Sequence, residues 1–172
     1  MTTDRLRAAT TLQAAVDFVQ KLDRRIRASS MPGFVLWNVA LSYAVVLPLA
    51  AFCVTFGLEA GPKFPDGVVE MFFATCVLGP PLETFVHQWL PIRILQRFGC
   101  RRSGTLVLVS AVGFGAAHWY SAYYIAAATL IGVVLGYAFL ACDESGRSPF
   151  LTVSLIHAAR NLVTFAFVVL GS

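Results

Sequence analysis

The chain has 172 residues, of which 58% are hydrophobic and only 13% are charged. Soluble globular domains are about half apolar and about a quarter charged, so this composition excludes an ordinary soluble enzyme and favours one polytopic membrane domain. The net charge of +4 comes from basic residues that border the apolar runs, which is the pattern of cytoplasmic loops in membrane proteins. The basic balance therefore does not indicate nucleic-acid binding.

Residues 1–30 predict an amphipathic helix rather than a membrane span. Apolar residues such as Leu12, Val16 and Val19 form a loose helical stripe, and arginines such as Arg24 and Arg25 supply a polar face. Helices of this kind lie on the membrane surface, with a solvated tail as the alternative. We therefore expect a cytoplasmic amphipathic segment over residues 1–32 and a transmembrane domain over residues 33–172.

The remaining sequence predicts an all-α bundle of about five transmembrane helices, because a bilayer requires roughly 20 apolar residues per helix. The expected helices cover residues 34–58, 67–90, 104–119, 122–141 and 149–170.

The prolines predict where a helix breaks, and the arginines predict the topology. Gly79-Pro80-Pro81 should bend or break the second helix, since proline removes a backbone hydrogen bond. A basic loop is expected at residues 93–102, on the same cytoplasmic side as the N-terminus, which places the C-terminus outside. The Gly132-x-x-x-Gly136 and Gly113-x-x-x-Ala117 spacings predict close helix packing.

Several polar groups interrupt the apolar segments, and an ionisable residue inside a membrane is by default a candidate functional residue. Glu83 follows the proline pair and is suited to act as a general base. His118 ends the third predicted helix. Phe114 lies one turn before it on the same face and would wall the site from lipid.

The fifth predicted helix carries a second polar pair. His157 and Asn161 are four residues apart and therefore share one helix face. Two neutral donors on one face are suited to hold a developing oxyanion; the alternative is a pair of satisfied core residues. The expected helix limits place His118 near the outer surface and His157 near the inner one. Both reach one water only if the third helix is longer, tilted or re-entrant.

A metal site is the main chemical alternative. His87 lies one turn after Glu83, and together with His118 and His157 these residues would supply enough ligands for zinc. However, the sequence contains no H-E-x-x-H pair. We expect no metal and no cofactor.

The ordered motifs Pro81 to Glu83, Phe114-x-x-x-His118, Gly132-x-x-x-Gly136-Tyr and His157-x-x-x-Asn161 resemble the CAAX protease and bacteriocin-processing (CPBP or Abi) family of glutamic-type intramembrane endopeptidases. The resemblance covers about residues 75–168. It implies that Glu83 and His118 activate water, and that His157 and Asn161 hold the oxyanion. No metal and no nucleophilic side chain is then required.

The resemblance also implies partners and a location. The substrate would be a membrane-associated protein or peptide, and the lipid bilayer is the other partner. The protein would be integral to a bacterial inner (cytoplasmic) membrane, with its N-terminus cytoplasmic. The alternatives are a non-catalytic membrane partner, such as a bacteriocin-immunity-type protein, and a zinc-dependent membrane protease.

The chain departs from the family's E-E-x-x-x-R motif at two supporting positions. Thr84 replaces the second glutamate and Gln88 replaces the arginine. A neutral hydrogen bond between Thr84 and Gln88 would replace the lost ion pair. Arg160 stands beside the His157 and Asn161 face, and we expect it to supply the missing positive charge by pairing with Glu83.

Overall fold

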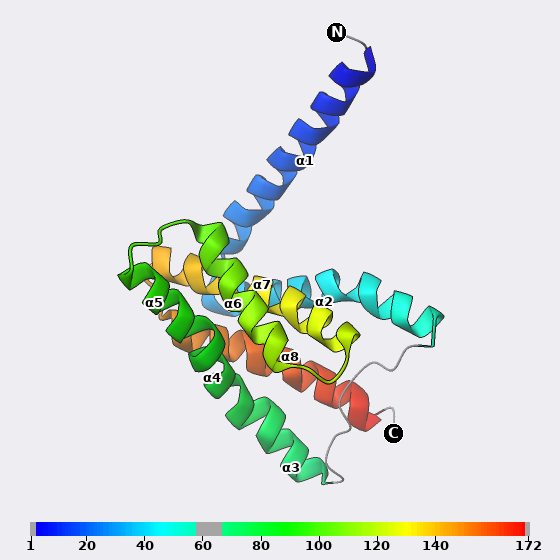
Figure 1. The fold of residues 1–172 in the computed structure, drawn as a ribbon, viewed down its shortest axis with the longest axis vertical. Helices are drawn as coiled ribbons and strands as arrows, with labels where there is room; N and C mark the ends of the chain where they lie inside the picture. The colour runs from blue at the N-terminus through cyan, green and yellow to red at the C-terminus, as the bar shows by residue number, and fades with distance from the viewer. Residues whose placement is uncertain (1–2, 58–66, 171–172) are drawn as a thin grey trace. The chain divides into compact units, whose positions relative to one another are not determined.

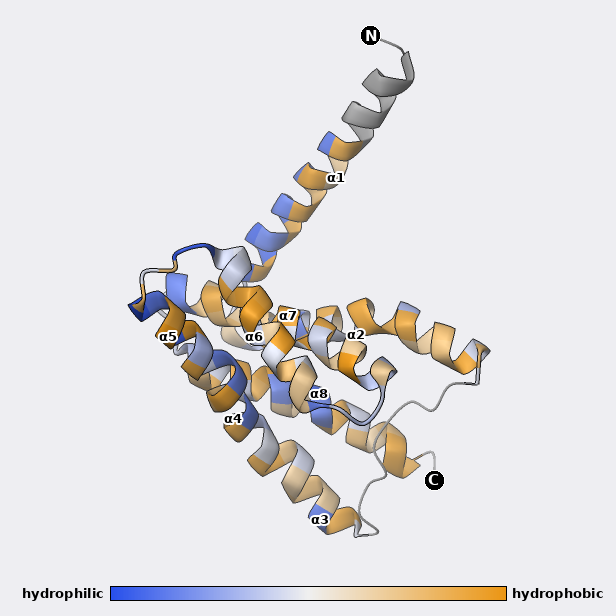
Figure 2. Ribbon diagram, viewed as in Figure 1, coloured by the Kyte–Doolittle hydropathy of each residue, from blue (hydrophilic) through white to orange (hydrophobic). Residues whose placement is uncertain are grey.

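The computed structural model describes residues 3–57 and 67–170, with side chains from Leu12 onward. All regular elements in these ranges are helices, so the predicted all-α class is confirmed. Four of them are long and apolar enough to cross a membrane: Met31–Thr55, Val68–Arg97, Ala122–Glu144 and Pro149–Leu170. Figure 2 shows the apolar residues that dominate these helices. The protein is therefore an integral membrane protein.

The internal contacts divide the chain into two units, Met1–Phe34 and Val35–Ser172. In the first unit, helix α1 (Thr3–Ala28) exposes Leu12 and Val19. Apolar and hydrophilic residues alternate along its described part in Figure 2. The location of α1 at a membrane surface and the domain boundary after residue 32 stay predictions.

In the second unit, the predicted first and last membrane helices are present. Helix α2 (Met31–Thr55) ends before the expected residue 58, which lies outside the described residues. Helix α8 (Pro149–Leu170) has the predicted bounds.

The segment around Gly79-Pro80-Pro81 is one continuous helix, and the predicted bend or break is wrong. Five elements follow one another without interruption: α3 (Val68–Phe72), the π-helix η1 (Phe73–Leu78), α4 (Gly79–Glu83), the π-helix η2 (Thr84–Trp89) and α5 (Leu90–Arg97). They form a single rod in Figure 1. Pro80 and Pro81 are the second and third residues of α4 and therefore lie inside this rod.

The π-helical turns explain how the rod accommodates the prolines. The Gly79 N–H donates to the carbonyl of Ala74, five residues back. An α-helix would instead place a carbonyl four residues before each proline, where the ring clashes with it. The wider π-turn relieves this clash, and the helix continues.

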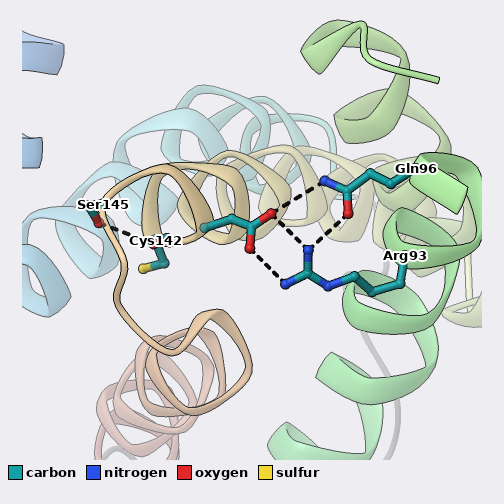
Figure 3. A network of polar contacts seen from close by, with 5 residues as sticks. Arg93, Gln96, Cys142 and Ser145 are labelled. Atoms are coloured by element: carbon teal, nitrogen blue, oxygen red, sulfur yellow. Dashed lines mark hydrogen bonds and ion pairs between the residues drawn. The ribbon is translucent and has the colours of Figure 1, made fainter. Parts of the chain in front are cut away.

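The predicted basic loop at residues 93–102 begins too early, because α5 continues to Arg97. The Arg93 guanidinium pairs bidentately with Asp143 of α7, through N–O distances of 2.8 and 2.7 Å. Gln96 accepts from Arg93 and donates to Asp143, which completes the network in Figure 3. Helix α7 (Ala122–Glu144) accordingly runs past the predicted end at residue 141.

Helix α7 packs closely against α6 (Ser103–Ala117), as the small residues predict. A Cβ added at Gly132 would lie 2.8 Å from the Ala111 Cα, and one at Gly136 would lie 3.4 Å from the Val107 Cα. Gly113 has no such neighbour, so its predicted packing role is wrong. A Cβ at Gly115 would instead meet Thr129 of α7.

Candidate active site

Three helices bring Glu83, His118 and His157 together. Glu83 ends α4, His118 follows the last residue of α6, and His157 lies within α8. The Glu83 Oε2 lies 3.6 Å from the His118 Nε2 and 3.7 Å from the His157 Nε2. Glu83 Oε2 is buried and has no hydrogen-bond partner among the described residues. One carboxylate oxygen therefore faces two imidazoles across gaps that a single small molecule can bridge.

Helix α6 bears on the expected conflict in depth between the two histidines. Its 15 residues span about 22 Å, which is less than the hydrocarbon thickness of about 30 Å. A helix that begins at one membrane surface therefore ends before it reaches the other. The predicted helix at residues 104–119 is almost equally short, so its length is not what differs from the expectation; the structure nevertheless places both histidine Nε2 atoms within 3.7 Å of Glu83 Oε2.

The backbone around His118 fixes the orientation of its ring. His118 leaves the helix with φ −102° and ψ 51°. Its Nδ1 lies 2.7 Å from the carbonyl oxygen of Phe114. Because a carbonyl only accepts, Nδ1 donates to Phe114, and Nε2 is the ring nitrogen that faces Glu83.

Phe114 lies among three histidine rings and is only 2% exposed. Its ring centroid is 4.5 Å from that of His118, 5.5 Å from that of His157 and 5.7 Å from that of His87. Phe114 therefore packs beside the site, and its expected role as a wall against lipid stays a prediction. Among the described residues His87 makes no ion pair with Glu83; its carbonyl accepts from Ser110 of α6 instead.

Asn161 lies one turn after His157 and contacts the first π-helix. Its Nδ2 donates to the Thr75 carbonyl at 2.9 Å, and its Oδ1 accepts from Arg160 at 3.4 Å. One of the two Nδ2 hydrogens remains for another acceptor. Asn161 also lines a pocket of about 80 Å³ between η1, α7 and α8.

Thr84 and Gln88 do not form the predicted hydrogen bond. Both side chains are fully buried, yet Thr84 Oγ1 and both polar atoms of Gln88 have no partner among the described residues. Residues four apart lie on one face of an α-helix, but Thr84 and Gln88 belong to a π-helix, which changes that spacing.

The predicted ion pair between Arg160 and Glu83 is also wrong. In the described part of the chain, Glu83 pairs only with the two histidines. The Arg160 guanidinium carbon lies 5.2 Å from the ring centroid of Tyr43 in α2. Three residues along an α-helix correspond to a rotation of about 300°, so Arg160 is turned about 60° away from His157.

Tyr43 and Thr75 support the site, although no sequence motif includes them. The Tyr43 hydroxyl donates to the Arg160 carbonyl at 2.8 Å and also contacts Thr164 Oγ1. The only sequence feature that marks Tyr43 and Thr75 is that each is a polar residue inside an apolar helix.

Among the side chains of residues 12–57 and 67–170, no three His, Cys, Asp or Glu are arranged to hold a metal ion. The expected absence of a metal stays a prediction.

Gly79 supplies a test of how the π-helical segment positions Glu83. A Cβ at residue 79 would lie 2.7 Å from the Ala74 carbonyl oxygen and 3.4 Å from Glu83 Oε1. Gly79→Ala is expected to destabilise the protein by about 1–3 kcal/mol, because the backbone must shift. Thermal unfolding in detergent measures the effect. Gly113→Ala is the control, since that position opens to free space; equal stability of the two variants would contradict the prediction.

A family model described as type II CAAX prenyl endopeptidase Rce1-like matches residues 65–163. This range is more than half of the chain and includes Glu83, His118, His157 and Asn161. No curated protein and no solved structure matches significantly.

Proposed function

The chain belongs to the type II CAAX prenyl endopeptidase Rce1-like family, and we propose that it is a glutamic-type intramembrane endopeptidase. Its substrate is a membrane-associated protein or peptide. The observation that carries this proposal is the approach of two histidine Nε2 atoms to one buried oxygen of Glu83, at 3.6 and 3.7 Å.

In the proposed reaction, the attacking water binds between Glu83 and His118. The separation of 3.6 Å between Glu83 Oε2 and His118 Nε2 is compatible with one water oxygen about 2.8 Å from both atoms. The carboxylate takes one proton of the water as general base. The Nε2 lone pair accepts a hydrogen bond from the other water hydrogen and so orients the oxygen for attack.

His157 and Asn161 are proposed to stabilise the oxyanion. His157 is 3% exposed, so its ring lies in a water-poor environment where a hydrogen bond to developing charge is strong. Asn161 has one uncommitted Nδ2 hydrogen. Collapse of the tetrahedral intermediate breaks the C–N bond, and the proton held by Glu83 passes to the leaving amine.

The location is part of the same proposal. We place the protein in a bacterial inner membrane, with α1 and the N-terminus on the cytoplasmic side. The basic residues of α1 and the arginines Arg97, Arg101 and Arg102 after α5 support this orientation, because positively charged segments remain cytoplasmic.

A non-catalytic membrane partner is the second candidate. The observation that favours it is the loss of both charges at Thr84 and Gln88, which leaves buried polar atoms without partners in the described structure. A single hydrolysis experiment distinguishes the two candidates.

Purified protein in liposomes is expected to hydrolyse membrane-associated peptides, and to do so in the presence of EDTA or phenanthroline, since Glu83 and His118 activate water directly. Product formation measured by mass spectrometry tests both points. Reversible loss of activity that zinc restores would establish the zinc-protease alternative. Failure to cleave any peptide or co-expressed membrane protein would favour the non-catalytic partner.

A further inference from the structure

Arg160 lies near the middle of the membrane helix α8. A charged side chain at this depth is costly and must face protein or a water-filled cavity. The groups around the Arg160 guanidinium therefore indicate the role of its positive charge.

Within the part of the chain that the structure describes, the residues around Arg160 do not neutralise its positive charge. The guanidinium carbon lies 5.2 Å from the Tyr43 ring, and one terminal nitrogen donates to Asn161 Oδ1 at 3.4 Å. The Arg160 Nε is buried without a hydrogen-bond partner. A guanidinium has five N–H donors. In the described ranges no carboxylate pairs with it.

Arg160 faces a pocket of about 80 Å³ in which polar and apolar residues meet. Its polar lining consists of Thr75, Tyr124, Arg160, Asn161 and Thr164, and Met71 is among its apolar residues. The volume exceeds what one water molecule requires, so the pocket has room for a small polar group of a ligand.

The pocket adjoins the proposed reaction centre. Asn161, which lines it, lies four residues and therefore about 6 Å along the helix from His157. An extended peptide advances about 3.3–3.6 Å per residue. A group held in the pocket would thus lie about two residues from the bond that the water activated by Glu83 attacks.

We propose that Arg160 binds a carboxylate of the substrate in this pocket, about two residues from the cleaved bond, and so determines specificity. The inference rests on the proposed function. A guanidinium and a carboxylate form paired, charge-assisted hydrogen bonds, which are strong where water is scarce. The carboxylate comes either from the C-terminus of the substrate or from an acidic side chain.

Three peptides test the inference in liposomes. All three end two residues after the cleaved bond. Two share one sequence and end as a free acid or as an amide, and the third is an amide that differs only by an aspartate at the last position. The wild type is expected to show a KM for the plain amide about 10–100-fold above that for the free acid, since a charged hydrogen bond is lost. The aspartate peptide shows which carboxylate source the pocket accepts.

Variants assign this preference to Arg160. Arg160→Gln is expected to cleave all three peptides with the KM of the plain amide, whereas Arg160→Lys retains part of the preference because it keeps the charge. Arg97→Gln removes the same charge from an exposed position on α5 and should keep the wild-type preference.

Equilibrium binding of the same peptides to Glu83→Gln separates this inference from the proposed function. A carboxylate preference in binding that disappears in Glu83→Gln/Arg160→Gln supports the inference even without hydrolysis. Equal binding of all three peptides overturns it, even if the protein is a protease. A lower kcat in Arg160→Gln with unchanged preference shows that Arg160 only orients Asn161, which also overturns it.

Discussion

Glu83→Gln is expected to reduce peptide hydrolysis by about 10²–10⁴-fold, because the amide keeps the shape of the side chain but cannot accept a proton from water. Initial rates in liposomes, at equal amounts of folded protein, measure the loss. The effect should appear in kcat, since Glu83 acts on water and not on substrate binding.

Glu70→Gln is the matched control for this experiment. Glu70 lies on the same long helix but is exposed, so its replacement should leave turnover unchanged. Similar unfolding temperatures for the two variants would show that both are folded. Near-normal turnover of Glu83→Gln would rule out the glutamic mechanism.

His118→Ala is expected to cause a loss of about 10²–10⁴-fold as well, because the alanine variant lacks the Nε2 lone pair that faces Glu83 at 3.6 Å. Added imidazole should restore part of the activity, since it can reoccupy the space of the missing ring. Rates with and without imidazole provide the measurement.

Trp119→Ala controls for disturbance of the chain after α6, because Trp119 is the next residue and is 81% exposed. It should remain active and show no response to imidazole. If His118→Ala retains wild-type rates, the role of His118 is only to terminate α6 through the hydrogen bond between its ring and the Phe114 carbonyl.

Much of the architecture could be predicted from composition and spacing. Long apolar runs leave few alternatives to membrane helices, since every backbone polar group must be satisfied within the bilayer. The i, i+4 spacing of His157 and Asn161 likewise defines a face without any knowledge of tertiary contacts.

Geometry that depends on the neighbours of a helix could not be predicted. The proline pair indicated a break, but whether a helix breaks or widens depends on local turns that a sequence pattern does not encode. The continuation of α5 to Arg97 is accompanied by the pairing of Arg93 with Asp143, which is 50 residues away.

The candidate site could be predicted only in part from the sequence, for the same reason. Glu83, His118 and His157 stood out because each interrupts an apolar segment. The structure places both histidine rings beside one carboxylate oxygen of Glu83. The partners of Arg160, Thr84 and Gln88 were mispredicted, because a side chain's direction depends on helix rotation as well as on its position in the sequence.

The two π-helices affect how the direction of Glu83 depends on the number of residues before it. A π-helix is wider than an α-helix and arises when one residue more is accommodated within a turn. In an α-helix each residue advances the chain by about 100° around the axis. A chain that lost one residue from η1 and regained regular α-helical winding would therefore keep Glu83 close to its present direction relative to the residues before η1, because the wide turn had taken up the additional residue. The same deletion from an α-helical turn such as α3 would instead rotate Glu83 by about 100° relative to the residues before that turn.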